Sequence, residues 1–520
     1  MNLLPRLSAA FTTILALVPA LAAAQDLRLD QNSLPSPAWS ATERWVWTQL
    51  LDDGQNAADL EDYCRSKDQA DAVRLDPRHD GDQAWRNPCR IISARFLRDI
   101  LTRSPWRDAL PSRGVGIASV KVLGSLSLDN AKLSRAFWLG LSRIEGDVTL
   151  VRTRTDSMIG LIGTVVTGEF IGDGLQTDTD LQLRGDTEFR RNVSLNQARI
   201  NGILDMTDTK LVGTLSLQGV RVFDVFLRSS TKAKAPASFA GGSGVEMTLA
   251  KITNRLDFRG AILGDVNLSG ATIAGDLVLG TQGSFRTEWK RANGTAAKLD
   301  LRNAQVGNLQ DEETAWPGQG YLLLQGFSFA HLSGAAGKSG MLHGHEDPDW
   351  WARLDQRYSV TPYTQLAAAL AAMGDRGAAR RIQFLARQRA RDADWQSGSW
   401  PAWFGQTFLL GVAGYGIGGY TFIVLVWVCG LSLAGALVLA LTVPDAMDKD
   451  RGAVWCFGAS LSRLLPVIEI NKEFTDYFND PKRERLKQRW QQLFFDCLGV
   501  IGWVLGALLI AALSGLTQNP

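Results

Sequence analysis

Histidine and cysteine are scarce in this chain, which has four His and five Cys among 520 residues. No two cysteines form a Cys-x-x-Cys pair. His343 and His345 are separated by a single residue, which is not the ligand spacing of structural zinc sites. We therefore expect no bound metal.

The common signatures of nucleotide binding and hydrolysis are also missing. The chain has no Gly-x-x-x-x-Gly-Lys-Ser/Thr loop and no Gly-x-Ser-x-Gly elbow, and the glycines from Gly411 to Gly416 follow no predicted strand. We expect no cofactor and assign no catalytic residue, so the sequence favours a protein that is not an enzyme. A formal net charge of +2 gives no reason to expect nucleic acid as a partner.

Charged residues are absent between Trp395 and Pro444, which predicts a membrane segment over residues 401–520. Two stretches in it can span a hydrocarbon core of ~30 Å, one at about 420–441 and one at about 498–516. Lysine and arginine are concentrated between them, so the positive-inside rule places the loop at about 443–495 in the cytoplasm. We expect the apolar part of that loop to lie along the membrane surface.

Two glycines in the second predicted span, Gly502 and Gly506, have the four-residue spacing that permits close helix contact. The partner helix is either the first span or a second copy of the chain. The sequence leaves both alternatives open.

The first residues predict export. Arg6 precedes a mostly apolar run, and Ala22 to Ala24 fit a cleavage site, so residues 1–24 have the form of a signal peptide. An uncleaved anchor helix is the alternative, and export follows from either. Cys64 and Cys89 are the only cysteines outside the predicted membrane segment, and an oxidising compartment would allow them to form a disulfide.

Between Gly116 and Phe329, apolar-x-apolar triplets recur about every eleven residues, a period that no helix produces. Glycine before many triplets permits the positive φ of a tight corner, and the alternation that follows suits a strand. Two units per coil would give about 22 residues per turn, so we predict a mainly β chain with a parallel β-helix over residues 111–332. Examples of the triplets begin at Leu126, Phe137, Val148, Ile159, Val193, Leu204 and Leu215.

Helical caps are expected at both ends of the solenoid, because an open β end exposes unpaired backbone. The N-terminal cap covers 25–110, with one helix after the Ser40/Glu43 capping box and another opening at Asn87. A linker and an αα-hairpin over 333–400 form the second cap.

Three segments interrupt the repeat, at 229–244, 281–296 and 310–320. Insertions in repeat proteins collect on one face, often the binding face. Trp289, Trp316 and Asp311 lie in these segments and are therefore candidate ligand contacts. The alternative is that the aromatic residues cover exposed solenoid surface.

Carboxylates gather in the middle of the repeat, where two on stacked coils could serve a glycosidase. Aspartate at such corners is also ordinary turn chemistry, and this interpretation is favoured. The residues are Asp173, Asp178, Asp180, Asp186, Asp205 and Asp208.

Several stretches resemble a family of bacterial membrane-anchored β-helix proteins, related in style to the pentapeptide-repeat proteins. They include Glu43-Arg-Trp-Val-Trp47, Ser93-Ala-Arg-Phe-Leu-Arg-Asp99, Leu301-Arg-Asn-Ala-Gln-Val-Gly307 and Pro362-Tyr-Thr-Gln-Leu-Ala367. The resemblance implies location at the bacterial inner membrane with most of the chain in the periplasm. Some members carry a membrane-associated oxidoreductase label, but the sequence contains no recognisable flavin, nicotinamide or haem site.

These observations favour a membrane-anchored periplasmic scaffold or binding protein whose partner is an envelope protein or a cell-wall glycan. A polysaccharide-modifying enzyme acting on the solenoid surface is the second hypothesis. The third is an oligomeric channel or signalling component that assembles through its transmembrane helices.

Overall fold

The structure, a computed structural model, describes most of the chain. The described residues are 34–52, 57–67, 75–79, 83–280, 285–333, 350–355, 358–372, 374–443, 446, 451–465, 470–478, 486 and 488–513. The predicted signal peptide, the His343–His345 segment and most of the basic cluster between the predicted spans lie outside them. The chain divides into two compact units, Met1–Gln365 and Leu366–Pro520.

Short helices precede the first complete coil. The expected capping box is present, because the Ser40 hydroxyl accepts the Glu43 amide at 3.1 Å and the Glu43 carboxylate accepts the Ser40 amide at 2.7 Å. The helix expected from Asn87 begins later, at Ala94, because residues 91–93 pair with the next coil as a strand. The elements are α3 (Ala41–Leu51), α4 (Leu60–Ser66), η1 (Gln83–Arg86), η2 (Pro88–Arg90), α5 (Ala94–Thr102) and α6 (Trp106–Ala109).

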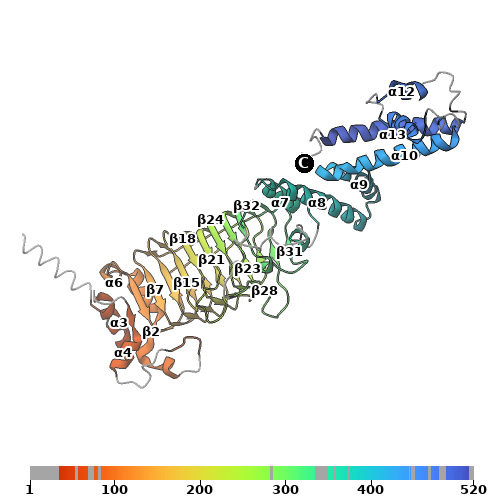
Figure 1. Ribbon diagram of the computed structural model, residues 1–520. Helices are drawn as coiled ribbons and strands as arrows, with labels where there is room; N and C mark the ends of the chain where they lie inside the picture. Colours follow the sequence, from red (N-terminus) through yellow and green to blue (C-terminus); the bar gives the residue numbers. More distant parts are fainter. Residues whose placement is uncertain are drawn as a thin grey trace, which may run out of the picture. The chain divides into compact units, whose positions relative to one another are not determined.

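The predicted β-helix is confirmed as a parallel β-solenoid of about ten turns with about 22 residues per coil. Its strands stack into three parallel sheets, and neighbours in a sheet come from successive coils (Figure 1). Sheet A consists of β1 (Ala58–Asp59), β3 (Val115–Ala118), β6 (Lys132–Leu133), β7 (Phe137–Gly140), β10 (Arg154–Thr155), β11 (Ile159–Ile162), β14 (Gln176–Thr177), β15 (Leu181–Arg184), β18 (Arg199–Asp205), β21 (Arg221–Phe226), β24 (Lys251–Asp257), β27 (Thr272–Val278), β30 (Gln305–Gln310) and β32 (Ser328–Leu332).

The other two sheets have nine strands each. Sheet B consists of β2 (Ile91–Ser93), β4 (Lys121–Leu123), β8 (Arg143–Glu145), β12 (Val165–Val166), β16 (Glu188–Phe189), β19 (Lys210–Leu211), β22 (Ser238–Phe239), β25 (Ile262–Leu263) and β28 (Glu288–Trp289). Sheet C consists of β5 (Leu126–Ser127), β9 (Val148–Thr149), β13 (Phe170–Ile171), β17 (Val193–Ser194), β20 (Leu215–Ser216), β23 (Val245–Glu246), β26 (Val266–Asn267), β29 (Leu299–Asp300) and β31 (Leu322–Leu323).

Strand register explains the eleven-residue period. Phe137 in sheet A pairs with Ile159 one coil later, and Val148 in sheet C pairs with Phe170. Phe137 and Val148 are eleven residues apart in one coil, so each coil contributes one apolar pair to each of these two sheets. These side chains are buried, and full burial of one such side chain contributes about 1.5–3 kcal/mol. The core is therefore a column of stacked apolar residues along the solenoid axis.

Two coils are longer than the others. Val225 pairs with Leu256, 31 residues on, and Leu277 pairs with Leu309, 32 residues on. The extra residues fall in the first two predicted interruptions, yet each interruption also supplies a strand of sheet B, β22 or β28. Residues 310–320 add no length, because Leu309 pairs with Leu332 after an ordinary coil. That segment forms η3 (Glu313–Ala315) on the side where earlier coils have a sheet B strand.

One corner of each coil is a tight turn between sheet C and sheet A. In the first such turn the Leu128 carbonyl accepts the Ala131 amide at 3.0 Å, and Asn130 between them has a φ of 58°. The same corner of later coils also has a residue of positive φ. These residues are Asn130, Arg152, Gly174, Gln197, Gly219, Leu249, Gly270, Asn303 and Gly326.

The second unit is helical. The chain enters it through α7, which spans the division between the units. The helices are α7 (Val360–Ala372), α8 (Arg376–Gln396), α9 (Trp400–Ala413), η5 (Gly414–Gly416), η6 (Gly418–Phe422), α10 (Ile423–Thr442), α11 (Ala453–Leu464), α12 (Lys472–Phe478) and α13 (Arg489–Leu513).

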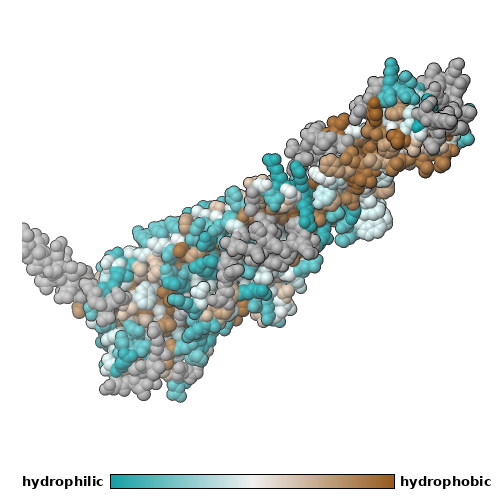
Figure 2. Space-filling view, viewed as in Figure 1, coloured by the Kyte–Doolittle hydropathy of each residue, from teal (hydrophilic) through white to brown (hydrophobic). Residues whose placement is uncertain are grey.

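Two helical stretches, Gly418–Thr442 and Arg489–Leu508, are long and apolar enough to cross a membrane, with mean hydropathies of 2.6 and 1.4. Figure 2 shows hydrophobic residues, in brown, gathered on the surface of this unit. Large exposed apolar side chains there include Leu433, Leu437, Leu441, Val500 and Trp503. An exposed apolar surface of this kind indicates membrane association.

The helix α11 packs against both apolar helices through small residues. A Cβ built on Gly435 of α10 would lie 2.0 Å from Ser460 Oγ, and one built on Gly502 of α13 would lie 1.6 Å from the Leu464 carbonyl oxygen. Gly506 has no neighbouring atom within 4 Å among the described residues. The close contact at Gly502 is therefore made with α11, the helix that we expected along the membrane surface.

Candidate functional site

The predicted ligand contacts lie at the end of the solenoid core. Trp316 is 7% exposed and Asp311 is 1% exposed, and Trp316 Nε1 donates to an Asp311 carboxylate oxygen at 2.7 Å. Trp289 is half-buried in β28 and donates to the Ala315 carbonyl at 2.7 Å. Trp351 packs against Trp316 with 5.6 Å between ring centroids. Trp316 and Asp311 are therefore buried side chains that help to close the last coils, which fits the alternative that these segments cover solenoid surface.

The two cysteines outside the helical unit, Cys64 and Cys89, are joined as a disulfide with their Cα atoms 5.4 Å apart. The bond links α4 to η2 at the start of the solenoid. Cys429, Cys456 and Cys497 of the helical unit are free.

The carboxylates considered for glycoside hydrolysis bind the backbone or side chains of neighbouring residues. Asp173 accepts the Asn196 amide at 2.9 Å and the Ser194 hydroxyl at 2.6 Å. Asp180 accepts the Ile203 amide at 2.9 Å, one coil later. The other members bind similarly: Asp178 to Asn201, Asp205 to Thr207, Asp208 to Ser230 and Asp186 to Arg78. The contacts of Asp173, Asp178, Asp180 and Asp208 tie successive coils together, whereas Asp205 binds within its own turn and Asp186 contacts the segment before the solenoid.

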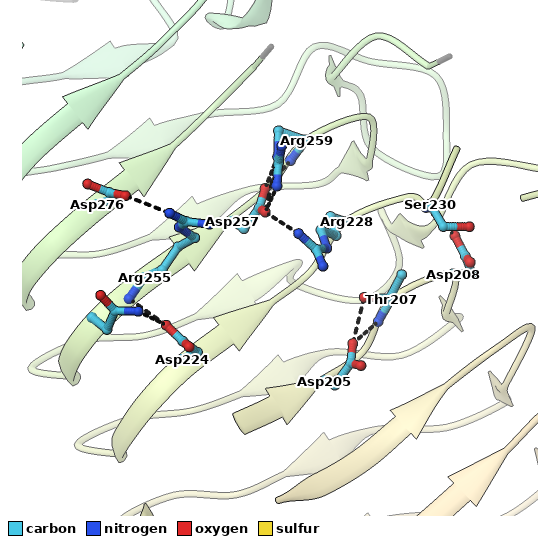
Figure 3. A network of polar contacts seen from close by, with 11 residues as sticks. Asp205, Thr207, Asp208, Asp224, Arg228, Ser230, Arg255, Asp257, Arg259 and Asp276 are labelled. Carbon is cyan, nitrogen blue, oxygen red and sulfur yellow. Dashed lines mark hydrogen bonds and ion pairs between the residues drawn. The ribbon is translucent and has the colours of Figure 1, made fainter. Parts of the chain in front are cut away.

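Charged residues on the wide part of sheet A form a paired network (Figure 3). The carboxylate of Asp257 is fully buried and accepts hydrogen bonds from Arg228 and Arg259. The hydrogen bond to Asp257 raises the pKa of Arg259 above its ordinary value. Asp276 accepts from Arg255 at 2.9 Å, and hydrogen bonds from Asn308 and then Arg255 lower the pKa of Asp276. This surface is internally neutralised and leaves little charge for a ligand.

One line of cations on sheet A is not neutralised in this way. After the positive-φ corner, the first residue of the sheet A strand is exposed in most coils and the second is buried. Examples are β6, β10, β21 and β24. Strand register places these first residues in one column. In order they are Lys132, Arg154, Gln176, Arg199, Arg221, Lys251, Thr272, Gln305 and Ser328.

The five cations of this line are here called the basic column: Lys132, Arg154, Arg199, Arg221 and Lys251. All five are exposed, and none makes an ion pair with any residue that the structure describes. Neighbouring strands in a sheet lie about 4.8 Å apart, so adjacent members of the column repel by up to about 1 kcal/mol in water. Like charges directly opposite each other on a sheet are destabilising.

In sheet B, by contrast, surface cations form ion pairs with carboxylates. Lys121 lies 3.5 Å from Glu145, while Arg190 and Lys210 lie 3.4 and 3.5 Å from the two oxygens of Glu188. The basic column therefore differs from sheet B, because its like charges repel one another over several coils and no carboxylate in the described part of the chain neutralises them. Such an arrangement is suited to an anionic ligand, which would remove the repulsion on binding.

The part of the column around Arg221 has apolar neighbours as well as charge. Phe223 lies two residues after Arg221 on the same outward face and is 44% exposed. Leu249 lies two residues before Lys251 and is 64% exposed. In an earlier coil, Arg154 instead has an acidic neighbour, because Asp156 follows it by two residues. Anion binding is therefore favoured most over Arg199, Arg221 and Lys251.

A hollow of about 320 Å³ lies on the adjoining sheet C. It shares coils with the basic column, because Ser194 and Ser216 of its lining precede Arg199 and Arg221 across one corner. Its other lining residues are Glu169, Ile171, Asp173, Asn192, Val193 and Thr214. Many of these polar groups bind one another, as when the Asn192 amide donates to Glu169 at 3.1 Å. The hollow adds a hydrogen-bonding surface beside the column.

The basic column was not predicted from the sequence, although the sequence carries a signal for it. A small residue, valine or threonine, then a cation, and then an apolar residue or threonine follow the positive-φ corner in five of the coils. The triplets are Ala131-Lys-Leu133, Thr153-Arg-Thr155, Ala198-Arg-Ile200, Val220-Arg-Val222 and Ala250-Lys-Ile252.

A comparison of the chain with family models, curated proteins and solved structures finds no match.

Proposed function

We propose that this protein is a membrane-anchored β-solenoid that binds an anionic polysaccharide of the cell envelope along its basic column. The observation that carries the proposal is the in-register line of five exposed, unpaired cations. Each strand step of about 4.8 Å is close to the length of one sugar unit, so charges repeated along a glycan can meet charges repeated along the solenoid.

The chemistry of the column suits a glycan with carboxylate or phosphate groups. Arginine and lysine form charge-assisted hydrogen bonds with such groups. Phe223 offers an exposed aromatic surface beside Arg221, against which the apolar face of a sugar ring can pack. The polar hollow on sheet C can bind hydroxyl groups from the same chain.

The location of the solenoid is part of the proposal. Two helices long and apolar enough to cross a membrane support anchoring. The Cys64–Cys89 disulfide supports exposure of the solenoid to an oxidising compartment, which for a bacterial inner-membrane protein is the periplasm.

The test compares two charge-matched double variants of the full chain in an uncharged detergent. Arg199→Gln with Arg221→Gln removes two cations of the basic column. Arg184→Gln with Lys210→Gln removes two exposed cations that are ion-paired and lie outside the basic column. Binding to polygalacturonate, a uronic acid polymer, is measured by biolayer interferometry, with neutral amylose as the control polymer.

We expect polygalacturonate to bind the unmodified protein and amylose to bind much more weakly. The column variant should lose about tenfold or more in affinity, and the matched variant should change little. Equal losses in the two variants would overturn the assignment of the column. Tighter binding of double-stranded DNA than of polygalacturonate would overturn the choice of a glycan.

A further inference from the structure

A cavity of about 230 Å³ lies in the helical unit at the start of the first apolar helix. Arg376, Arg380 and Gln383 of α8 line it on one side, and Ile417 and Gly418 line it on the other. No acidic residue is among the described residues that line it. The cavity is therefore a positively charged space beside an apolar segment.

The α8 residues face the cavity because they lie on one face of the helix, at positions i, i+4 and i+7. Ile382 and Ala379 are buried, which fixes the orientation of the helix. Arg376 and Arg380 are exposed, and neither makes an ion pair among the residues that the structure describes. Their guanidinium groups are therefore free to bind a ligand.

The Arg380 side chain lies close to Gly418, the residue at which the apolar segment begins. A Cβ added to Gly418 would lie 2.8 Å from Arg380 Cδ, so any larger residue would displace the arginine. Gly418 is also the first residue of the stretch Gly418–Thr442 that is long and apolar enough to cross a membrane. The two arginines therefore lie next to the end of a candidate span.

Aromatic residues lie at this end of the span. Phe384 of α8 stacks on Tyr420 with 3.9 Å between ring centroids and an interplanar angle of 14°. Phe384 also packs against Tyr415, with ring centroids 5.5 Å apart. Tyrosine and tryptophan are enriched at the level of lipid headgroups. In a membrane, the cavity would therefore lie at headgroup depth.

We propose that this cavity binds the phosphate group of an anionic membrane lipid, with Arg376 and Arg380 as hydrogen-bond donors. The guanidinium group presents paired N–H donors that match two phosphate oxygens. The Gln383 side chain can donate to a headgroup oxygen. The inference rests on the membrane anchoring of the proposed function, but it concerns a separate site from the basic column.

The experiment titrates the full chain in uncharged detergent with short-chain phosphatidylglycerol and measures binding by isothermal titration calorimetry. Arg376→Gln and Arg380→Gln are each compared with Arg387→Gln, which removes an exposed arginine from the same helix outside the cavity. We expect each cavity variant to weaken binding about tenfold and Arg387→Gln to change it less than about twofold. Arg380→Lys keeps the charge without the paired donors and should show an intermediate loss.

Gly418→Ala provides a second test, because it displaces Arg380 and leaves every charge in place. Weakened lipid binding in this variant supports a shaped site, whereas unchanged binding would reduce the effect to general attraction and overturn the proposal. Short-chain phosphatidylcholine should bind more weakly than phosphatidylglycerol. Inorganic phosphate that binds as tightly as the lipid would overturn the lipid as the ligand.

Polygalacturonate binding is measured on the same variants to keep the two proposals separate. It should be unchanged by all of these substitutions, since they lie outside the basic column. A loss of lipid binding alone therefore tests the cavity, and a failure of glycan binding in the unmodified chain tests only the proposed function.

Discussion

Leu249 holds a left-handed backbone conformation, with a φ of 57°, at a corner where other coils have Gly219 or Gly270. This conformation costs a non-glycine residue about 1–2 kcal/mol. The Leu249 side chain is largely exposed and gains little from burial. The chain therefore tolerates strain at this corner in a residue next to the basic column.

The strain predicts that Leu249→Gly stabilises the protein. We expect the free energy of unfolding to rise by up to about 1 kcal/mol, because the lost backbone strain exceeds the entropy cost of glycine. Leu123→Gly is the matched control: Leu123 is also exposed, but lies in strand β4, and glycine there should destabilise by about 1 kcal/mol. Thermal unfolding of the full chain in detergent distinguishes the two. Destabilisation of equal size in both variants would contradict the prediction.

Repulsion within the basic column predicts opposite effects of one substitution on stability and binding. Arg221→Thr should raise the free energy of unfolding by about 0.5 kcal/mol, because threonine suits a strand and no longer repels Arg199 or Lys251. It should also weaken polygalacturonate binding. Arg184→Thr removes a cation that is paired with Asp205, so it should leave binding unchanged and should not stabilise. Binding isotherms and melting temperatures on both variants check the prediction, and a destabilised Arg221→Thr would count against it.

At the scale of helices and strands, the helical unit depends on where its glycines meet a neighbour. Gly502 and Gly506 lie one turn apart in α13, yet only Gly502 contacts the backbone of α11. The two positions gain about the same helix propensity from alanine, about 1 kcal/mol. Any difference in stability between the two alanine variants therefore reports a difference in helix packing.

Gly502→Ala should lower the melting temperature of the detergent-solubilised chain, because its Cβ would overlap the Leu464 carbonyl and separate α13 from α11. Gly506→Ala should leave the melting temperature unchanged or raise it. Circular dichroism at the helix minimum is the measurement. If Gly506→Ala were the more damaging variant, the contact of α13 in the native protein would be with a second copy and not with α11.

The repeat could be predicted from sequence because the strand pattern and the glycine corners are local. Trp289 could not be placed, because the long coil before it hides that β28 continues sheet B. Trp316, which donates to Asp311, packs against Trp351, 35 residues further along the chain. Arg199, Arg221 and Lys251 are separated by 22 and 30 residues in sequence, and only strand register brings them into line. The positions of these residues therefore depend on contacts between coils, which local sequence patterns do not reveal.

For the whole molecule, the Cys64–Cys89 disulfide connects the fold to its location. We expect both thiols to be protected from alkylation in intact cells until a reductant is added. Deletion of residues 1–24 should retain the chain in a reducing compartment and leave both thiols reactive, as shown by mass shifts after labelling. Protected thiols in the deletion variant would contradict export as the source of the bond. Replacing both cysteines with serine should cost about 3 kcal/mol of stability.

The coils of the solenoid repeat at nearly equal steps, so Arg199, Arg221 and Lys251 form a row of evenly spaced positive charges on three successive strands. If a glycan binds there as proposed, a flexible chain with evenly spaced charges can place any three neighbouring charged units on this row, and each such alignment, or frame, has similar energy. The number of frames grows with the length of the polymer, and each additional contact raises the effective concentration of the next. Retention should therefore depend on polymer length more than on any terminal group, and a bound chain could shift along the solenoid without leaving it.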